Sequence, residues 1–185
     1  MATSNGPHLV AVAEPIAASR SPLRLRMART ADGNHLDGGW WPQSRDLAVE
    51  LADLVDHFPR TLGRVVRALV SPPDWDAVPR VVRVGGRSVK VGAFPRDDTH
   101  LIHLTTSDRT LLHVLVVPPG FTPDQGEEAL LAAATSGNAH SGTELLREVT
   151  EHPDVDPMDH WSDDGGAWWG SGRLAPSYRV GERGR

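Results

Sequence analysis

Residues 80–94, RVVRVGGRSVKVGAF, contain the pattern that decides the fold. Gly85 and Gly86 suit a two-residue hairpin turn, because such turns need positive φ angles. Pairing across this turn places four valines on one face, which are Val82, Val84, Val89 and Val91. Arg83 and Lys90 fall on the other face, with Val81 and Ser88. The sequence therefore predicts a β-hairpin with one apolar face and one basic face.

A second hairpin is predicted from residues 100–117. A loop of odd length around residues 107–108 separates apolar from polar side chains, whereas a loop of even length mixes them on both faces. One face then carries Ile102, Leu104, Leu112, Val114 and Val116. His103 and His113 face each other on the opposite side. Two histidines can begin a zinc or nickel site, but no third ligand falls beside them, so we predict no metal.

Three helices are expected. The first spans residues 45–57, with Ser44 as the N-cap, Asp46 in the first turn and Pro59 after its end. Its buried side chains recur at helical spacing and are Leu47, Leu51, Leu54, Val55 and Phe58. The second begins at Thr122 and ends near Gly137. The third begins at Ser141 and buries Leu145, Leu146 and Val149.

Further strands are predicted at residues 23–27 and 63–70. Together these elements predict an α+β fold with an antiparallel sheet of about five or six strands. One helix follows the first strand, and one or two C-terminal helices pack on the same face. The other face of the sheet is then solvated or holds a ligand or partner.

The chain of 185 residues suits one domain at residues 22–151. Composition predicts a disordered arm at residues 1–21 and a flexible, acidic, tryptophan-containing tail at residues 152–185. The absence of cysteine excludes disulfides and thiolate metal sites, and a formal net charge of -5 argues against a general nucleic-acid binder. Without a membrane segment or a signal peptide, we expect a cytoplasmic protein.

The segment at residues 37–47, DGGWWPQSRDL, resembles the signature of an actinobacterial family, a domain of unknown function. Residues 75–80, 86–94 and 115–119 fit the same pattern, so the resemblance covers about residues 23–135. It implies a small cytoplasmic actinobacterial protein. It brings no activity, substrate or catalytic residue with it.

The first candidate site lies in that segment. Trp40 and Trp41 can line a ligand groove that Arg45 and Asp46 complete with polar groups. The alternative is that one tryptophan packs under the sheet while the polar residues cap the helix. Neighbouring residues of an extended chain point to opposite sides, so we expect that only one of the two rings is in the core.

The second candidate site is a basic stripe on the open face of the sheet. Arg83 and Lys90, together with Arg64 or Arg67 from a neighbouring strand, can hold a phosphate, a carboxylate or an acidic peptide. Charged residues on a solvated strand face are also ordinary and discourage edge pairing.

The third candidate is the tail. Residues 151–164 contain six acidic residues and no Lys or Arg, and Trp161, Trp168 and Trp169 follow or interrupt them. Three tryptophans in an acidic segment are costly to leave in water, so we predict that they bind a surface. That surface is either the open sheet face of the same chain or a protein partner.

The sequence contains no phosphate-binding loop, no nucleophile elbow and no HExxH zinc motif. We therefore predict no catalytic residue and no cofactor, and favour a small binding or regulatory module over an enzyme. The alternative is an enzyme or small-molecule binder with its pocket near Trp40, Trp41 and Arg45. The oligomeric state stays open.

Overall fold

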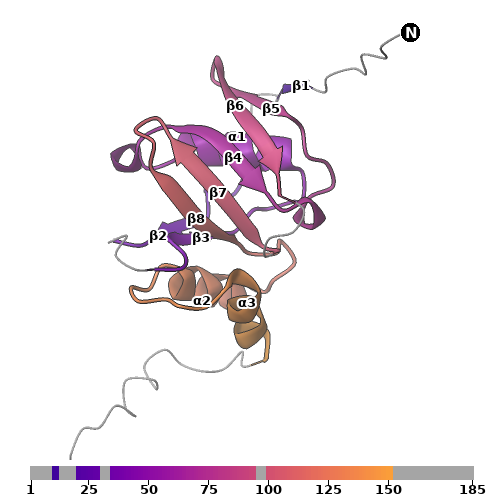
Figure 1. Cartoon of the computed structure of the whole chain (residues 1–185). Coiled ribbons are helices and arrows are strands. Elements are labelled where there is room, and N and C mark those ends of the chain that lie inside the picture. Colours follow the sequence, from indigo (N-terminus) through magenta and orange to yellow (C-terminus); the bar gives the residue numbers. More distant parts are fainter. Residues whose placement is uncertain (1–9, 13–19, 30–33, 95–98, 152–185) are drawn as a thin grey trace, which may run out of the picture. The chain divides into compact units, whose positions relative to one another are not determined.

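A computed structural model describes residues 10–12, 20–29, 34–94 and 99–151. These residues form an α+β fold built on one eight-stranded sheet (Figure 1). The sheet order is β1-β5-β6-β4-β7-β8-β3-β2. The strands are β1 (Val10–Val12), β2 (Leu25–Met27), β3 (Gly38–Trp40), β4 (Val65–Val70), β5 (Val81–Val84), β6 (Arg87–Ala93), β7 (Leu101–Thr106) and β8 (Leu111–Val116).

Both predicted hairpins are confirmed in register. In the first, Val82 pairs with Val89 and Arg83 pairs with Ser88. In the second, Ile102 pairs with Val114 and His103 pairs with His113. The predicted apolar faces are buried, because this register places the alternating apolar side chains of both hairpins on the face that packs against the core.

The sheet is mixed, not antiparallel as expected. Three of its neighbouring pairs are parallel, namely β1 with β5, β4 with β6, and β3 with β8. Each of these pairs joins strands that are distant in the sequence, so no local turn pattern predicts the pairing. The count also exceeds the expected five or six strands, because β1 and β3 are three-residue strands without apolar–polar alternation. Strand β1 lies within residues 1–21, the predicted arm, most of which is outside the described residues.

Helix α1 (Leu47–His57) covers one face of the sheet and buries the five predicted apolar side chains. Its N-cap is Asp46, not Ser44: the Asp46 carboxylate accepts hydrogen bonds from the backbone N–H groups of Ala48 and Val49. The Ser44 hydroxyl instead donates a hydrogen bond of 2.6 Å to the Glu50 carboxylate. The helix therefore begins two residues later than the capping pattern predicted.

Helices α2 (Pro123–Ala133) and α3 (Gly142–Glu151) lie on the opposite face from α1, which corrects the expectation of one covered face. Residues that alternate along β8 show this directly. Val114 and Val116 belong to the α1-side core, whereas Leu115 belongs to a second core with α2 and α3. Figure 1 shows α1 behind the sheet and the α2–α3 pair at the end of the sheet that holds β2 and β3.

The predicted start of α2 is confirmed by a complete capping box between Thr122 and Gln125. Close packing explains the two glycines of β3, against α2 at Gly39 and against β2 at Gly38. A Cβ at Gly39 would lie 3.0 Å from a methyl carbon of Leu130, and Gly38 adopts φ +157° against the backbone of Arg26. On the helix, Gly126 leaves room for the ring of Trp41.

Substituting Gly126 by alanine tests this packing. Helix propensity alone favours alanine by about 1 kcal/mol. The added methyl group would overlap the six-membered ring of Trp41, which is 5% exposed and cannot move aside. Overpacking of this kind costs about 1–3 kcal/mol, so we expect Gly126→Ala to lower the free energy of unfolding by about 1 kcal/mol net. Urea denaturation measures it, and a more stable variant would contradict the packing.

The capping box of α3 makes a second prediction. The backbone N–H of Ser141 donates to the Glu144 carboxylate at 3.0 Å, and this hydrogen bond holds the pKa of Glu144 below its usual 4.5. A lowered folded-state pKa stabilises the fold above the pKa of the unfolded chain, and that contribution disappears as the pH falls through the folded pKa. The stability advantage of the natural chain over Glu144→Gln should be present at pH 6 and shrink toward pH 3. A difference independent of pH would contradict it.

Candidate functional site

A cluster of basic side chains occupies the face of β5, β6 and β4 that is turned away from α1. Arg67 of β4 lies beside Lys90 of β6 in the sheet register, and Arg83 of β5 lies diagonally across from Lys90. All three side chains are exposed. Arg80 is also exposed, just before β5, where it lies opposite Val91 instead of Lys90. Because Arg80 lines the same groove as Arg67 and Lys90, we include it in what we call the basic face.

An irregularity in β4 helps to present Arg67. The pairing of β4 with β7 shifts between Val65 and Arg67, so that Val66 has no partner of its own. A bulge of this kind re-aims the side chains that follow it. Val65 is buried, whereas Val66 is 41% exposed and Arg67 is exposed. The structure therefore selects Arg67 over Arg64 as the neighbour of Lys90, since Arg67 is in register with Lys90 and Arg64 precedes the strand, where its backbone N–H and carbonyl pair with Ser107.

The charges of the basic face are not compensated within the described residues. Some other cations in this part of the chain do have carboxylate partners, for example Arg87 with Asp56 and Arg45 with Asp76. None of the four basic-face residues forms an ion pair there. Neighbouring like charges repel, so an anion placed among them gains from all of them at once.

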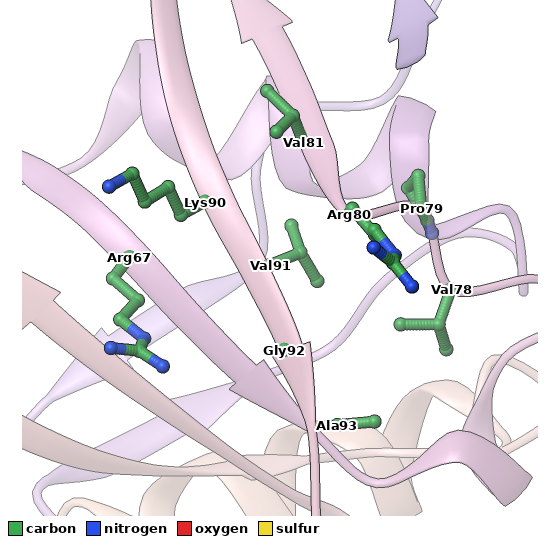
Figure 2. A pocket seen from close by; sticks show the side chains of 9 residues that line it. All are labelled: Arg67, Val78, Pro79, Arg80, Val81, Lys90, Val91, Gly92 and Ala93. Carbon is green, nitrogen blue, oxygen red and sulfur yellow. The ribbon is translucent and has the colours of Figure 1, made fainter. Parts of the chain in front are cut away.

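A groove of about 710 Å³ adjoins these charges (Figure 2). The groove lies between the last residues of β6 and the segment just before β5, which diverges from β6. Its charged lining residues are Arg67, Arg80 and Lys90, and its other walls are Val78, Pro79, Val81, Val91, Gly92 and Ala93. Figure 2 shows Arg67 and Lys90 on one side of β6 and Arg80 on the other. The groove thus combines apolar walls with charges of one sign, which suits an anionic ligand with some apolar surface.

The two facing histidines lie on the same sheet face. Their ring centroids are 4.5 Å apart, and the ring of Phe94 lies 4.9 Å from that of His103. The cross-strand pair is thus confirmed. His100 is engaged elsewhere, with its Nδ1 3.1 Å from the buried carboxylate of Asp74. No group of three or more potential His, Asp or Glu metal ligands occurs among the residues that the structure describes.

Trp40 and Trp41 are both buried, at 1% and 5% exposure, so the expectation that only one of them is core is wrong. They do point to opposite faces, as the extended chain requires, but each face is covered. Trp40 stacks on Trp75 in the α1-side core, with ring centroids 5.5 Å apart. Trp41 lies in the second core, where its indole N–H donates to the carbonyl of Pro118. Neither ring forms the wall of an open groove.

Arg45 and Asp46 hold structural contacts. The Arg45 guanidinium pairs with Asp76 at 3.0 Å and donates to the carbonyl of Pro73 at 2.9 Å. Asp46 caps α1. The structure therefore does not unite the six predicted ligand-binding residues: Arg83 and Lys90 lie on the basic face, and the other four lie around the start of α1. Trp161, Trp168 and Trp169, predicted to bind a partner, lie outside the described residues.

Two polar centres were missed by sequence reasoning. Glu50 is 2% exposed, and its carboxylate accepts hydrogen bonds from Arg20 at 2.5 Å, from Ser44, and from the backbone of Gln43. Arg24 stacks over Trp41 at 3.6 Å, and burial lowers the pKa of its guanidinium below its usual value. The charge of Glu50 alone predicts a solvent-exposed helix position. Its burial is explained by Arg20, which is distant in the sequence, together with the donors at Gln43 and Ser44.

The basic face and its groove define a class: an α+β domain with a mixed sheet that exposes one cationic surface. The chain belongs to a family of unknown function, DUF5994, which it matches over residues 23–133. This confirms the resemblance to a domain of unknown function. Comparisons with curated proteins and with solved structures give no match. No helix in the described part of the chain is long and apolar enough to cross a membrane.

The buried Glu50 network predicts a non-additive response to substitution. Arg20→Ala leaves a buried carboxylate without its cation, and Glu50→Gln leaves the cation without its carboxylate. Removing one partner of a buried pair costs about 3 kcal/mol or more. We expect the double variant to lose at least about 1 kcal/mol less than the two single losses added together, by urea denaturation. Additive losses would show that the two side chains do not interact.

Proposed function

We propose that the chain is a small cytoplasmic binding or regulatory module that acts without catalysis, and that the basic face is its contact surface for an acidic ligand. One observation carries the proposal. Arg67, Arg80 and Lys90 line one groove, and Arg83 lies diagonally across from Lys90 on β5. None of the four has a carboxylate partner among the described residues. A protein with a formal net charge of -5 has carboxylates in excess, so an unpaired cationic surface is the feature that a ligand would use.

The chemistry of the cations favours carboxylate or phosphate oxygens. Arginine presents a planar fork that matches two oxygens, and lysine adds a compact point charge. Arg67 and Lys90 are neighbours on adjacent strands, which lie about 4.8 Å apart. One anionic group can therefore contact both. Arg80 and Arg83 extend the surface along β5 and supply contacts for further negative groups.

The actinobacterial origin and the cytoplasmic location belong to the same proposal. The resemblance of residues 37–47 supports both. The chain also has 18 arginines but a single lysine, a skew that is typical of GC-rich coding and agrees with an actinobacterial origin. Trp161, Trp168 and Trp169 stay candidate partner-binding residues, because three large rings in an acidic segment are costly to leave in water. The enzyme alternative draws no support from Trp40, Trp41 and Arg45, whose contacts are all structural.

Charge reversal tests the proposal. The probe is an acetylated, amidated hexapeptide that alternates glutamate and threonine, titrated into the full chain at low ionic strength by calorimetry. We expect Arg83→Glu combined with Lys90→Glu to weaken binding at least tenfold, because two attractive contacts become repulsive. Added salt should weaken binding to the natural chain.

Arg60→Glu is the matched control, since Arg60 is exposed but belongs to the short helix after α1 and not to the basic face. It should bind the peptide within about twofold of the natural chain. Equal losses in the control and in the double variant would show a general charge effect. No detectable binding to the natural chain would refute the proposed function itself.

A further inference from the structure

Strand β6 continues beyond the end of its pairing with β5. The ladder between them runs from Val84–Arg87 to Val81–Lys90, and one more hydrogen bond follows, from the backbone N–H of Val91 to the carbonyl of Arg80 at 2.8 Å. Strand β6 extends to Ala93, whereas the segment before Val81 diverges from it. Residues 91–93 of β6 therefore line the groove instead of pairing with β5.

The direction of the backbone groups follows from the alternation of a strand. The N–H of Phe94 donates to the carbonyl of Val70 in β4 at 3.1 Å. Residues 91 and 93 then aim their N–H and C=O groups the other way, toward the groove, as the bond from Val91 to Arg80 confirms. The Val91 carbonyl and the Ala93 N–H and carbonyl have no hydrogen-bond partner on that side among the described residues.

We propose that this groove binds an extended acidic peptide, which adds to Val91–Ala93 as a short extra strand. The inference rests on the proposed function and names its ligand. The free backbone groups of Val91 and Ala93 pair with the main chain of the peptide, which is the usual source of affinity in strand addition. Acidic side chains of the peptide then reach Arg67, Lys90 and Arg80.

A peptide fits better than a small anion for two reasons. A phosphate or a single carboxylate would meet the cations but leave the free strand edge unpaired. It would also leave empty most of a groove of about 710 Å³ whose remaining walls are apolar. Side chains on one face of an extended peptide recur about every 7 Å. A peptide beside Val91–Ala93 can therefore direct acidic side chains on one face toward Lys90, which is the neighbour of Arg67. Side chains on its other face can contact Val91, which points to the opposite side of the sheet.

The experiment removes the strand pairing and keeps the charges. Ala93→Pro deletes the N–H that faces the groove, which makes no hydrogen bond in the structure, so thermal unfolding should change little. Ala93→Val keeps the N–H and is the matched control. The full chain and both variants are titrated with the glutamate–threonine hexapeptide and with the same peptide N-methylated at alternate amides.

We expect the N-methylated peptide to bind the natural chain at least fivefold more weakly, and Ala93→Pro to weaken the plain peptide similarly, while Ala93→Val binds as the natural chain does. Inorganic phosphate should bind more weakly than the peptide at equal ionic strength. If N-methylation and Ala93→Pro leave the affinity unchanged while Arg83→Glu with Lys90→Glu abolishes it, the strand pairing is wrong and the proposed function stands. If the charge reversal has no effect either, both fail.

Discussion

The whole arrangement depends on a constraint at Trp40 and Trp41: consecutive residues of an extended chain must point to opposite sides of the sheet. Both rings are large enough to need burial, so both faces of the sheet must be covered at this point. Helix α1 covers the Trp40 side, and α2 and α3 cover the Trp41 side. Gly39 on β3 and Gly126 on α2 follow from the same constraint, because they let α2 approach the strand and the Trp41 ring closely.

This two-sided covering also explains where the sheet stays open. The second helix layer packs on β2, β3 and the adjoining part of β8, whereas α1 packs on the other face near β5. No described element covers the outer face of β5, β6 and β4, which carries the exposed cations Arg67, Arg83 and Lys90. The fold leaves this surface uncovered. The surface holds cations without carboxylate partners and ends in a free strand edge, and these two features are the basis for proposing an acidic, extended ligand.

Much of the fold could be read from local patterns. The Gly85–Gly86 turn fixes one hairpin, and period-2 alternation of valine and leucine fixes the register of both. Capping boxes at Thr122 and Ser141 predicted two helix starts correctly. The parallel pairs were missed because they join distant segments, and β3 was missed because Gly-Gly-Trp carries no strand pattern. The basic stripe was predicted from alternation at Arg83 and Lys90, but the groove depends on where β5 begins relative to β6, which no local signal reports.

Nuclear magnetic resonance mapping of the full chain during titration with the acidic hexapeptide tests directly whether the peptide adds to β6. We expect backbone amide shifts to change first at Val91, Ala93 and Arg67, with the amide of Ala93 moving downfield as it gains a hydrogen bond. Shift changes centred on α2 and α3 or on the first turn of α1, with residues 90–93 unmoved, would contradict it.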